Sequence, residues 1–154
     1  MRVLFVCTGN TCRSAMAEAM ARALTQSRGL ASVLVSSAGT SAWDGAPASD
    51  GALLVGIERR LDLNAHRARA LAPDVVAEAD LILGMGAHHV ERAVVLGGDG
   101  KSFLLAAYAD ESGEGRGVAD PFGGDLDLYR ATADELESLV SRALDRIARE
   151  AAAE

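Results

Sequence analysis

The stretch VLFVCTGNTCRSAMAEAM, residues 3–20, decides the fold of this chain. Residues 2–6 form a mostly apolar run that is long enough for a buried strand and too short for a helix. From Ser14 onward the residues favour a helix, which Ser14 can cap and Gly29 can end. A strand therefore passes into a helix through a short loop, residues 7–13.

Strand-like and helix-like segments alternate along the rest of the chain. Further strands are predicted at 33–37, 81–85 and 102–105. Helices are predicted at 49–60, 73–79 and 86–96 and near the C-terminus, and residues 106–124 are expected to form a long connection. This alternation predicts a single α/β domain, residues 1–154, with a parallel sheet covered by helices on both faces. Ligands bind beyond the carboxyl ends of such strands, which is where Cys7 is expected.

The composition limits the possible classes of protein. The 154 residues fit one domain, and a net charge of −7 disfavours a general binder of nucleic acid or of anionic membranes. No apolar run approaches the roughly 20 residues that span a bilayer. The short apolar N-terminus lacks a cleavage site, so we expect a soluble cytoplasmic protein.

The cysteines and histidines do not form a metal-binding pattern. Cys7 and Cys12 are too few for a disulfide scaffold or for a four-ligand zinc site. The histidines, His66, His88 and His89, do not complete a cluster with them. We therefore expect no metal, and we expect His88 and His89 to lie on the surface.

The loop between the first strand and its helix has the composition of an anion site. Backbone N–H groups and the helix dipole collect at such a turn. Gly9 lets the backbone curl and Asn10 tolerates a left-handed conformation, while Arg13 can grip two oxygens of an oxyanion. This positive field favours the thiolate of Cys7, which could attack phosphorus in line while Ser14 donates a hydrogen bond to the sulfur. A cysteine that ends a strand can also be a small core residue, but the order of residues favours the anion site.

The segment Cys7-Thr8-Gly9-Asn10-Thr11-Cys12-Arg13-Ser14 resembles the phosphate loop of the low-molecular-weight protein-tyrosine-phosphatase family. The resemblance extends over essentially the whole chain, through the SAGT segment at Ser37, His66 and the DPFGG segment at Asp120. It implies a four-stranded parallel sheet flanked by helices, and phosphomonoester hydrolysis through a phosphocysteine without a metal or another cofactor. The implied substrates are phosphorylated proteins or peptides, and the implied product is inorganic phosphate.

The resemblance also implies roles for single residues. Cys7 resembles the nucleophile, Arg13 the phosphate clamp and Ser14 the serine that supports the thiolate. Asp120 resembles the general acid that protonates the leaving group. On residue type alone, three other aspartates compete for that role: Asp110, Asp125 and Asp127.

The other loop residues bind phosphate by the same resemblance: Thr8, Gly9, Asn10, Thr11 and Cys12. Asn10, together with Ser37 and His66, resembles the hydrogen-bonded set that holds the loop in shape. Cys12 resembles a redox partner that traps oxidised Cys7 as a disulfide, and a small residue that merely fits is the equal alternative.

The residues that bear on the substrate point in two directions. Thr11 resembles the protein-arginine-phosphatase branch, where a hydroxyl suits a guanidinium, and Phe122 resembles a pocket wall of that branch. Trp43 resembles the aromatic residue with which tyrosine-directed members stack, although an indole can also hold a guanidinium or anchor a loop. Gly123 replaces a second aromatic residue of those members. We expect a slight preference for phosphoarginine, with phosphotyrosine as the alternative.

Two other classes of protein remain as alternatives. A thiol-dependent arsenate reductase resembles this family in its loop, but it relays a disulfide through further cysteines, and none follows Cys12. A non-catalytic oxyanion-binding module would bind phosphate without turnover. The joint presence of Cys7, Arg13, Ser14 and Asp120 favours the enzyme over this module.

Overall fold

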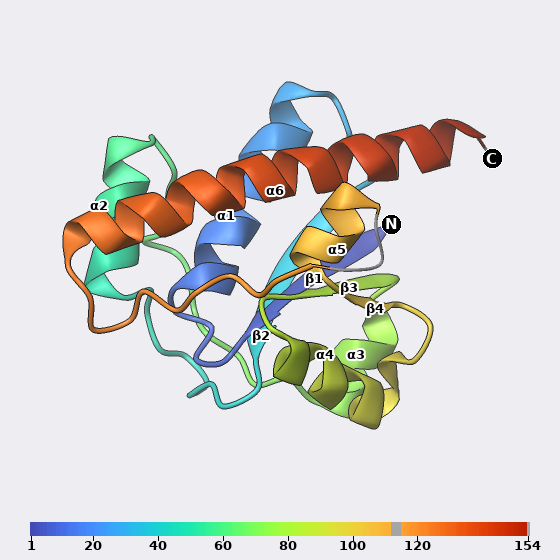
Figure 1. Ribbon diagram of the computed structural model, residues 1–154, viewed down its shortest axis with the longest axis horizontal. Coiled ribbons are helices and arrows are strands. Elements are labelled where there is room, and N and C mark those ends of the chain that lie inside the picture. The colour runs from blue at the N-terminus through green and yellow to red at the C-terminus, as the bar shows by residue number, and fades with distance from the viewer. Residues whose placement is uncertain (112–114, 154) are drawn as a thin grey trace.

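Four parallel strands form the centre of the protein in a computed structural model that describes residues 1–111 and 115–153 (Figure 1). The strands are β1 (Arg2–Cys7), β2 (Leu34–Gly39), β3 (Leu81–Gly84) and β4 (Ser102–Leu104). Their order in the sheet is β2-β1-β3-β4, and every pair is parallel. The α/β class and the four-stranded parallel sheet are confirmed.

Helices cover both faces of this sheet (Figure 1). On one face lie α1 (Arg13–Ser27), α5 (Leu105–Asp110) and α6 (Leu126–Ala153), with α2 (Asp50–Glu58) beside α1 and α6. On the other face lie α3 (Pro73–Glu78), α4 (Ala87–Ala93) and the π-helical turn η1 (Val94–Gly98). None of the described helices is long and apolar enough to cross a membrane.

The sequence of β1 explains its central place. Val3, Phe5 and Cys7 belong to the core shared with α1 and α6, whereas Leu4 and Val6 pack in the core on the side of α3. Alternate side chains of a strand point to opposite faces, so a strand buried on both faces needs a continuous apolar run. Cys7 is the last residue of this run and lies at the carboxyl edge of the sheet.

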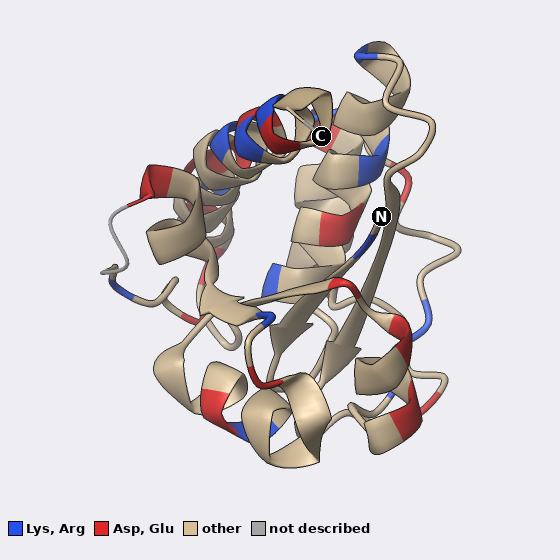
Figure 2. Ribbon diagram, turned by 90° about the vertical axis from the view of Figure 1, so that its right-hand side faces the viewer, with Lys and Arg blue, Asp and Glu red and all other residues tan. Residues whose placement is uncertain are grey.

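The long C-terminal helix α6 forms one wall of the larger core. Leu136, Val140 and Leu144 are buried at a spacing of four residues, so one side of the helix faces α1. Charges of both signs lie along its outer side (Figure 2). The predicted amphipathic helix is thus present, and it begins close to the segment that carries Asp120.

Two predictions about local structure were wrong. Residues 105–110, predicted as the end of a strand and the start of a connection, form α5, because Leu105 and Tyr108 are buried and Arg146 of α6 donates to the Tyr108 carbonyl at 3.1 Å. The rest of that connection includes residues 112–114, which lie outside the described residues. The helix predicted at 86–96 ends at Ala93 and opens into η1, where Gly97 has φ of 109°.

Candidate active site

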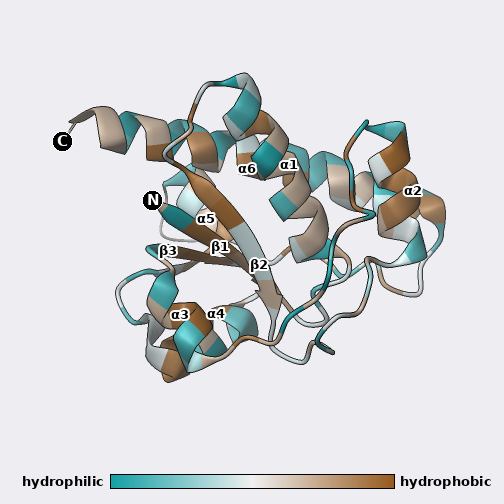
Figure 3. Cartoon of the chain, turned by 180° about the vertical axis from the view of Figure 1, so that it is seen from behind, coloured by the Kyte–Doolittle hydropathy of each residue, from teal (hydrophilic) through white to brown (hydrophobic). Residues whose placement is uncertain are grey.

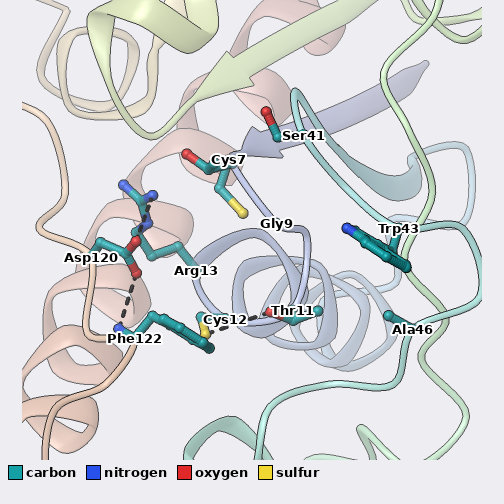
Figure 4. Close-up of a pocket in the computed structure, with 11 residues that line it drawn as sticks. Cys7, Gly9, Thr11, Cys12, Arg13, Ser41, Trp43, Ala46, Asp120 and Phe122 are labelled. Carbon is teal, nitrogen blue, oxygen red and sulfur yellow. Dashed lines mark hydrogen bonds and ion pairs between the residues drawn. The ribbon is translucent and has the colours of Figure 1, made fainter.

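A cavity of about 320 Å³ opens beyond the carboxyl end of β1 (Figure 4). Three segments that are distant in the sequence contribute to it: the loop 7–13, the loop after β2 and the segment before α6. The residues that line it are Cys7, Thr8, Gly9, Thr11, Cys12, Arg13, Ser41, Trp43, Ala46, Asp120 and Phe122. The structure therefore gathers most of the predicted site residues around one cavity.

The sulfur of Cys7 receives two hydrogen bonds from its own loop. The Asn10 N–H donates to the sulfur at 3.3 Å, and the Ser14 hydroxyl lies 2.9 Å from it. Because the side-chain amide of Asn10 donates to the Ser14 oxygen at 2.8 Å, the Ser14 proton is left for the sulfur. Two donors at one sulfur stabilise a thiolate.

Ser14 reaches this position because it does not cap the helix, which corrects the prediction from sequence. The cap residue of α1 is Cys12, and no side chain accepts a hydrogen bond there. Ser14 is instead the second residue of α1 and is fully buried. Its hydroxyl consequently bonds to Asn10 and Cys7 rather than to the start of the helix.

Asn10 organises the back of the loop. Its φ of 57° is left-handed, as the sequence predicted for asparagine at this position. Its side-chain amide also donates to Ser37 at 2.8 Å, and its carbonyl accepts a hydrogen bond from His66 Nε2 at 2.6 Å. The structure therefore brings together Asn10, Ser37 and His66, the three residues expected to support the loop.

Residues that the sequence analysis did not single out extend this network. The Ser37 hydroxyl donates to Glu18 at 2.9 Å, and the backbone N–H of Arg69 donates to the side-chain oxygen of Asn10 at 3.0 Å. Figure 3 shows β2 changing from hydrophobic at its start to more hydrophilic in its middle, where Ser37 meets Asn10. Hydrophilic residues in a strand of a buried sheet were the sequence signal for such a network.

The close approach of two backbones at the loop depends on Gly39 rather than on Gly9. A Cβ atom at Gly39 would lie 2.4 Å from the Thr8 carbonyl oxygen and 2.9 Å from the Asn10 nitrogen. A Cβ atom at Gly9 would make only an ordinary contact, at 3.6 Å from the Thr11 hydroxyl. The tight curl predicted at Gly9 is therefore produced by Asn10, and Gly39 gives it room.

Arg13 and Asp120 form one side of the cavity (Figure 4). The Arg13 guanidinium is buried, donates to the Val118 carbonyl at 2.9 Å and lies 3.6 Å from the Asp120 carboxylate. Its Nε atom is buried without a hydrogen-bond partner among the described residues. An oxyanion bound beside it would supply the acceptor.

Asp120 is positioned by the turn that follows it. One carboxylate oxygen accepts a hydrogen bond from the Phe122 N–H at 3.0 Å, and half of the side-chain surface remains exposed. The three competing aspartates, Asp110, Asp125 and Asp127, do not line the cavity. Among the aspartates, Asp120 alone combines the cavity with a contact to Arg13 in the described part of the chain.

Two exposed aromatic side chains stand at the mouth of the cavity. Trp43 is 84% exposed and Phe122 is 71% exposed. Figure 4 places them on opposite sides, with Thr11 between them. Trp43 is therefore available to a ligand and is not a buried loop anchor.

Cys12 is buried at the edge of the cavity, in a triangle with two hydroxyl groups. Its sulfur is 3.1 Å from the Ser49 oxygen and 3.3 Å from the Tyr129 oxygen, and the two oxygens are 3.2 Å apart. Burial, and then the hydrogen bond to Cys12, raise the pKa of Tyr129 to about 12. The phenol thus stays protonated and remains a donor within the triangle.

His89 lies in the interior, so the prediction that it is a surface residue was wrong, whereas His88 is exposed as expected. The Nε2 atom of His89 is 2.9 Å from the Thr8 hydroxyl, and its Nδ1 atom accepts a hydrogen bond from the Gly86 N–H at 2.9 Å. Burial, together with the nearby charges of His88 and Arg13, lowers the pKa of His89 to about 4. A helical spacing of four residues from the buried Ala93 could have placed His89 on the inner side of α4.

No three potential metal ligands of the types His, Cys, Asp and Glu gather anywhere in residues 1–111 and 115–153. The polar groups of the cavity instead match an anion. Arg13 and the N-terminal end of α1 are on one side of Cys7, and the Asp120 carboxylate is at the rim. An oxyanion over the sulfur would therefore meet the N–H groups at the start of α1 and the Arg13 guanidinium, with the Asp120 carboxylate nearby.

Known proteins resemble this chain in sequence and in fold. A family model described as "Low molecular weight phosphotyrosine protein phosphatase" matches residues 2–153. The chain is 38% identical over 146 residues to a protein-arginine-phosphatase of Geobacillus stearothermophilus, with 95% of each chain covered. It is 36% identical over 143 residues to the low molecular weight protein-tyrosine-phosphatase PtpB of Staphylococcus haemolyticus, with 92% of this chain and 96% of the relative covered.

A solved structure shows similarity to the same family of phosphatases. The C7S mutant of the YwlE arginine phosphatase, whose active-site serine is phosphorylated, superposes with a TM-score of 0.90 at 35% identity over 100% of both chains. The fold and the loop define a cysteine-dependent phosphatase class. The chain belongs to the low-molecular-weight phosphotyrosine protein phosphatase family.

Proposed function

We propose that this protein releases phosphate from phosphorylated proteins or peptides through a phosphocysteine at Cys7, with a slight preference for phosphoarginine. One observation carries the proposal. The Cys7 sulfur accepts from Asn10 and Ser14 at the floor of a cavity that also presents Arg13 and Asp120. A stabilised thiolate, an anion clamp and a carboxyl group are the groups that a two-step phosphoryl transfer requires.

In the first step the Cys7 thiolate attacks phosphorus, and an S–P bond forms as the bond to the leaving atom breaks. Arg13 and the backbone N–H groups of the loop hold the phosphoryl oxygens, where negative charge accumulates. Asp120 gives its proton to the departing nitrogen or oxygen. Its place beside Arg13 in the lining of the cavity suits this transfer (Figure 4).

In the second step water attacks the phosphocysteine while Asp120 accepts a proton, and the S–P bond breaks. Ser14 supports the departing sulfur because its hydroxyl proton is directed there by Asn10. Activity then needs a deprotonated Cys7 and a protonated Asp120 at the outset, so the rate rises and then falls with pH. Asp120→Asn removes the alkaline fall and lowers kcat by about 100-fold or more.

The preference for phosphoarginine is supported by the walls of the cavity. Thr11 adds a hydroxyl to the lining of the cavity, and Trp43 presents an exposed indole that can face a guanidinium. The same two aromatic side chains, Trp43 and Phe122, could also flank a phenyl ring, which keeps phosphotyrosine as the second candidate. The similarity to a protein-arginine-phosphatase over 95% of the chain favours the first.

We further place the protein in the cytoplasm, since a reducing compartment keeps the thiols of Cys7 and Cys12 available for this chemistry.

The test compares phosphate release from a phosphoarginine peptide and a phosphotyrosine peptide of the same length. Wild type should release phosphate faster from phosphoarginine, and Cys7→Ser should release none from either. Thr11→Val keeps the shape of the side chain and removes the hydroxyl, so it should lower only the phosphoarginine rate, by about ten-fold. Faster phosphotyrosine turnover by wild type would reverse the assigned preference and leave the phosphocysteine mechanism in place.

A further inference from the structure

His89 is a buried polar residue that the two reaction steps do not use. It is fully buried, and it lies on α4, on the opposite face of the sheet from α1, the helix that carries Arg13. Its ring makes two hydrogen bonds, one to the backbone of Gly86 and one to the side chain of Thr8. Thr8 directly follows Cys7 and lines the cavity.

The contact with Gly86 determines which nitrogen of His89 carries the proton. A backbone N–H only donates, so Nδ1 must accept and must be unprotonated. In a neutral imidazole the proton then resides on Nε2. Nε2 therefore donates to the Thr8 hydroxyl oxygen, 2.9 Å away.

The charges around the ring keep it in this neutral form. The groups that act on it are His88, whose ring centroid is 3.8 Å away, Arg13 and Asp120. Burial, His88 and Arg13 all disfavour a second proton, and only Asp120 favours one. A doubly protonated ring would also lose the hydrogen bond from Gly86.

The direction of this hydrogen bond leaves the Thr8 proton available. Because the Thr8 oxygen accepts from His89, its own proton needs another acceptor, and no described residue provides one. We propose that His89 is a positioning residue that turns the Thr8 hydroxyl into a hydrogen-bond donor for a phosphoryl oxygen bound above Cys7. This inference rests on the proposed phosphatase function, and it gives the side-chain hydroxyl of Thr8 a part in holding the anion.

A hydroxyl that accepts one hydrogen bond is a better donor for a second one, particularly to a charged acceptor. Thr8 would thus add a side-chain donor to the backbone N–H groups and to Arg13. Since a hydrogen bond to a charged group is worth more than a neutral one, removal of the Thr8 hydroxyl should weaken phosphate binding by about ten-fold.

The experiment measures the dissociation constant of inorganic phosphate by calorimetry, in the Cys7→Ala background, which has no nucleophile at this position. Thr8→Val should weaken binding by about ten-fold, and Thr8→Ser, which keeps the hydroxyl, should bind as the parent does. His89→Asn keeps an acceptor near Nδ1 for Gly86 but loses the donor to Thr8, so it should weaken binding as Thr8→Val does. The double variant should be no weaker than either, because both changes remove one interaction.

His89→Gln separates positioning from a purely structural role. Its amide nitrogen can reach the place of Nε2 and donate to Thr8, while the Gly86 N–H loses its acceptor. The melting temperature should therefore fall more in His89→Gln than in His89→Asn, whereas phosphate binding should fall more in His89→Asn. The neighbouring exposed residue supplies the control, and His88→Asn should bind phosphate as the parent does.

Equal phosphate binding by Thr8→Val and its parent would overturn the inference, as would equal weakening in His89→Asn and His89→Gln. If a His89 variant does not fold, the comparison of Thr8→Val with Thr8→Ser still decides the role of the hydroxyl. The proposed function fails by a different result, namely phosphate release that survives Cys7→Ser. The two failures are therefore distinguishable.

Discussion

Cys7 and Cys12 are almost equally buried, with 2% and 4% of their surfaces exposed, yet their surroundings differ in kind. The Cys7 sulfur ends a strand, faces the cavity and accepts from an N–H and from a hydroxyl whose direction Asn10 fixes. The Cys12 sulfur shares a closed triangle with the hydroxyls of Ser49 and Tyr129. Burial alone therefore does not distinguish a nucleophile from its neighbour, whereas the groups around each sulfur do: only Cys7 has a backbone N–H donating to its sulfur among the described residues.

Exchange of each sulfur for oxygen gives the largest expected difference between the two sites. Cys7→Ser should lower kcat by a factor on the order of 10⁴ or more, because the nucleophile of the reaction is lost. Cys12→Ser should keep most of the activity, since a serine can form the same triangle with Ser49 and Tyr129. Steady-state rates on one phosphopeptide measure both, and a comparable loss in the two variants would contradict the comparison.

The hydroxyl partners of the two sulfurs give the next largest difference. Ser14→Ala removes a donor to the Cys7 sulfur and should lower kcat by about ten-fold or more. Ser49→Ala removes a partner of Cys12 and the hydrogen bond to the Ala52 N–H that caps α2. It should lower the free energy of unfolding by about 1 kcal/mol and leave kcat within two-fold. Urea unfolding and steady-state rates, measured on both variants, would separate the two effects.

Peroxide tests whether the two sulfurs can react with each other. Hydrogen peroxide oxidises the Cys7 thiolate to a sulfenic acid, and the Cys12 thiol can then displace water from it to form a disulfide. A dithiol reductant would restore wild type, whereas Cys12→Ser should recover poorly because its Cys7 oxidises further. Phosphatase activity is measured before peroxide, after peroxide and after dithiothreitol. Equal recovery of both proteins would exclude the protective disulfide between Cys12 and Cys7.

The last expected effect concerns pH and stability, and it arises at His89, which contacts Thr8 in the same loop. The pKa of His89 is lowered to about 4, so between pH 6.5 and 4 the unfolded chain binds a proton at His89 that the folded chain does not. The free energy of unfolding should therefore decrease as the pH falls through this window, by up to about 1.4 kcal/mol per pH unit for one proton.

His89→Asn should flatten that slope, and His88→Asn should keep most of it. Urea unfolding at several pH values between 4 and 7 provides the measurement. An unchanged slope in His89→Asn would show that other groups account for the loss of stability in acid.

Local sequence patterns were sufficient to predict much of the fold of this protein. The apolar run before Cys7, the helix-forming residues after Arg13 and the alternation of elements predicted the sheet and its place in the fold. The left-handed backbone at Asn10 was predicted from residue type, because asparagine tolerates this conformation. Asp120 and Trp43 were assigned to the site by resemblance, since they have no local feature that marks them as parts of the cavity around Cys7.

The sequence by itself determined the strand, the loop and the helix that carry Cys7 and Arg13, because these depend on neighbours in the chain. Only the tertiary structure decided which hydroxyl group contacts which sulfur, and placed the His89 ring within hydrogen-bond distance of the Thr8 hydroxyl. The partners in these contacts include Tyr129 and Cys12, 117 positions apart, and His89 and Thr8, 81 positions apart. Such contacts arise when helices from distant segments pack on opposite faces of one sheet, and no local propensity encodes them.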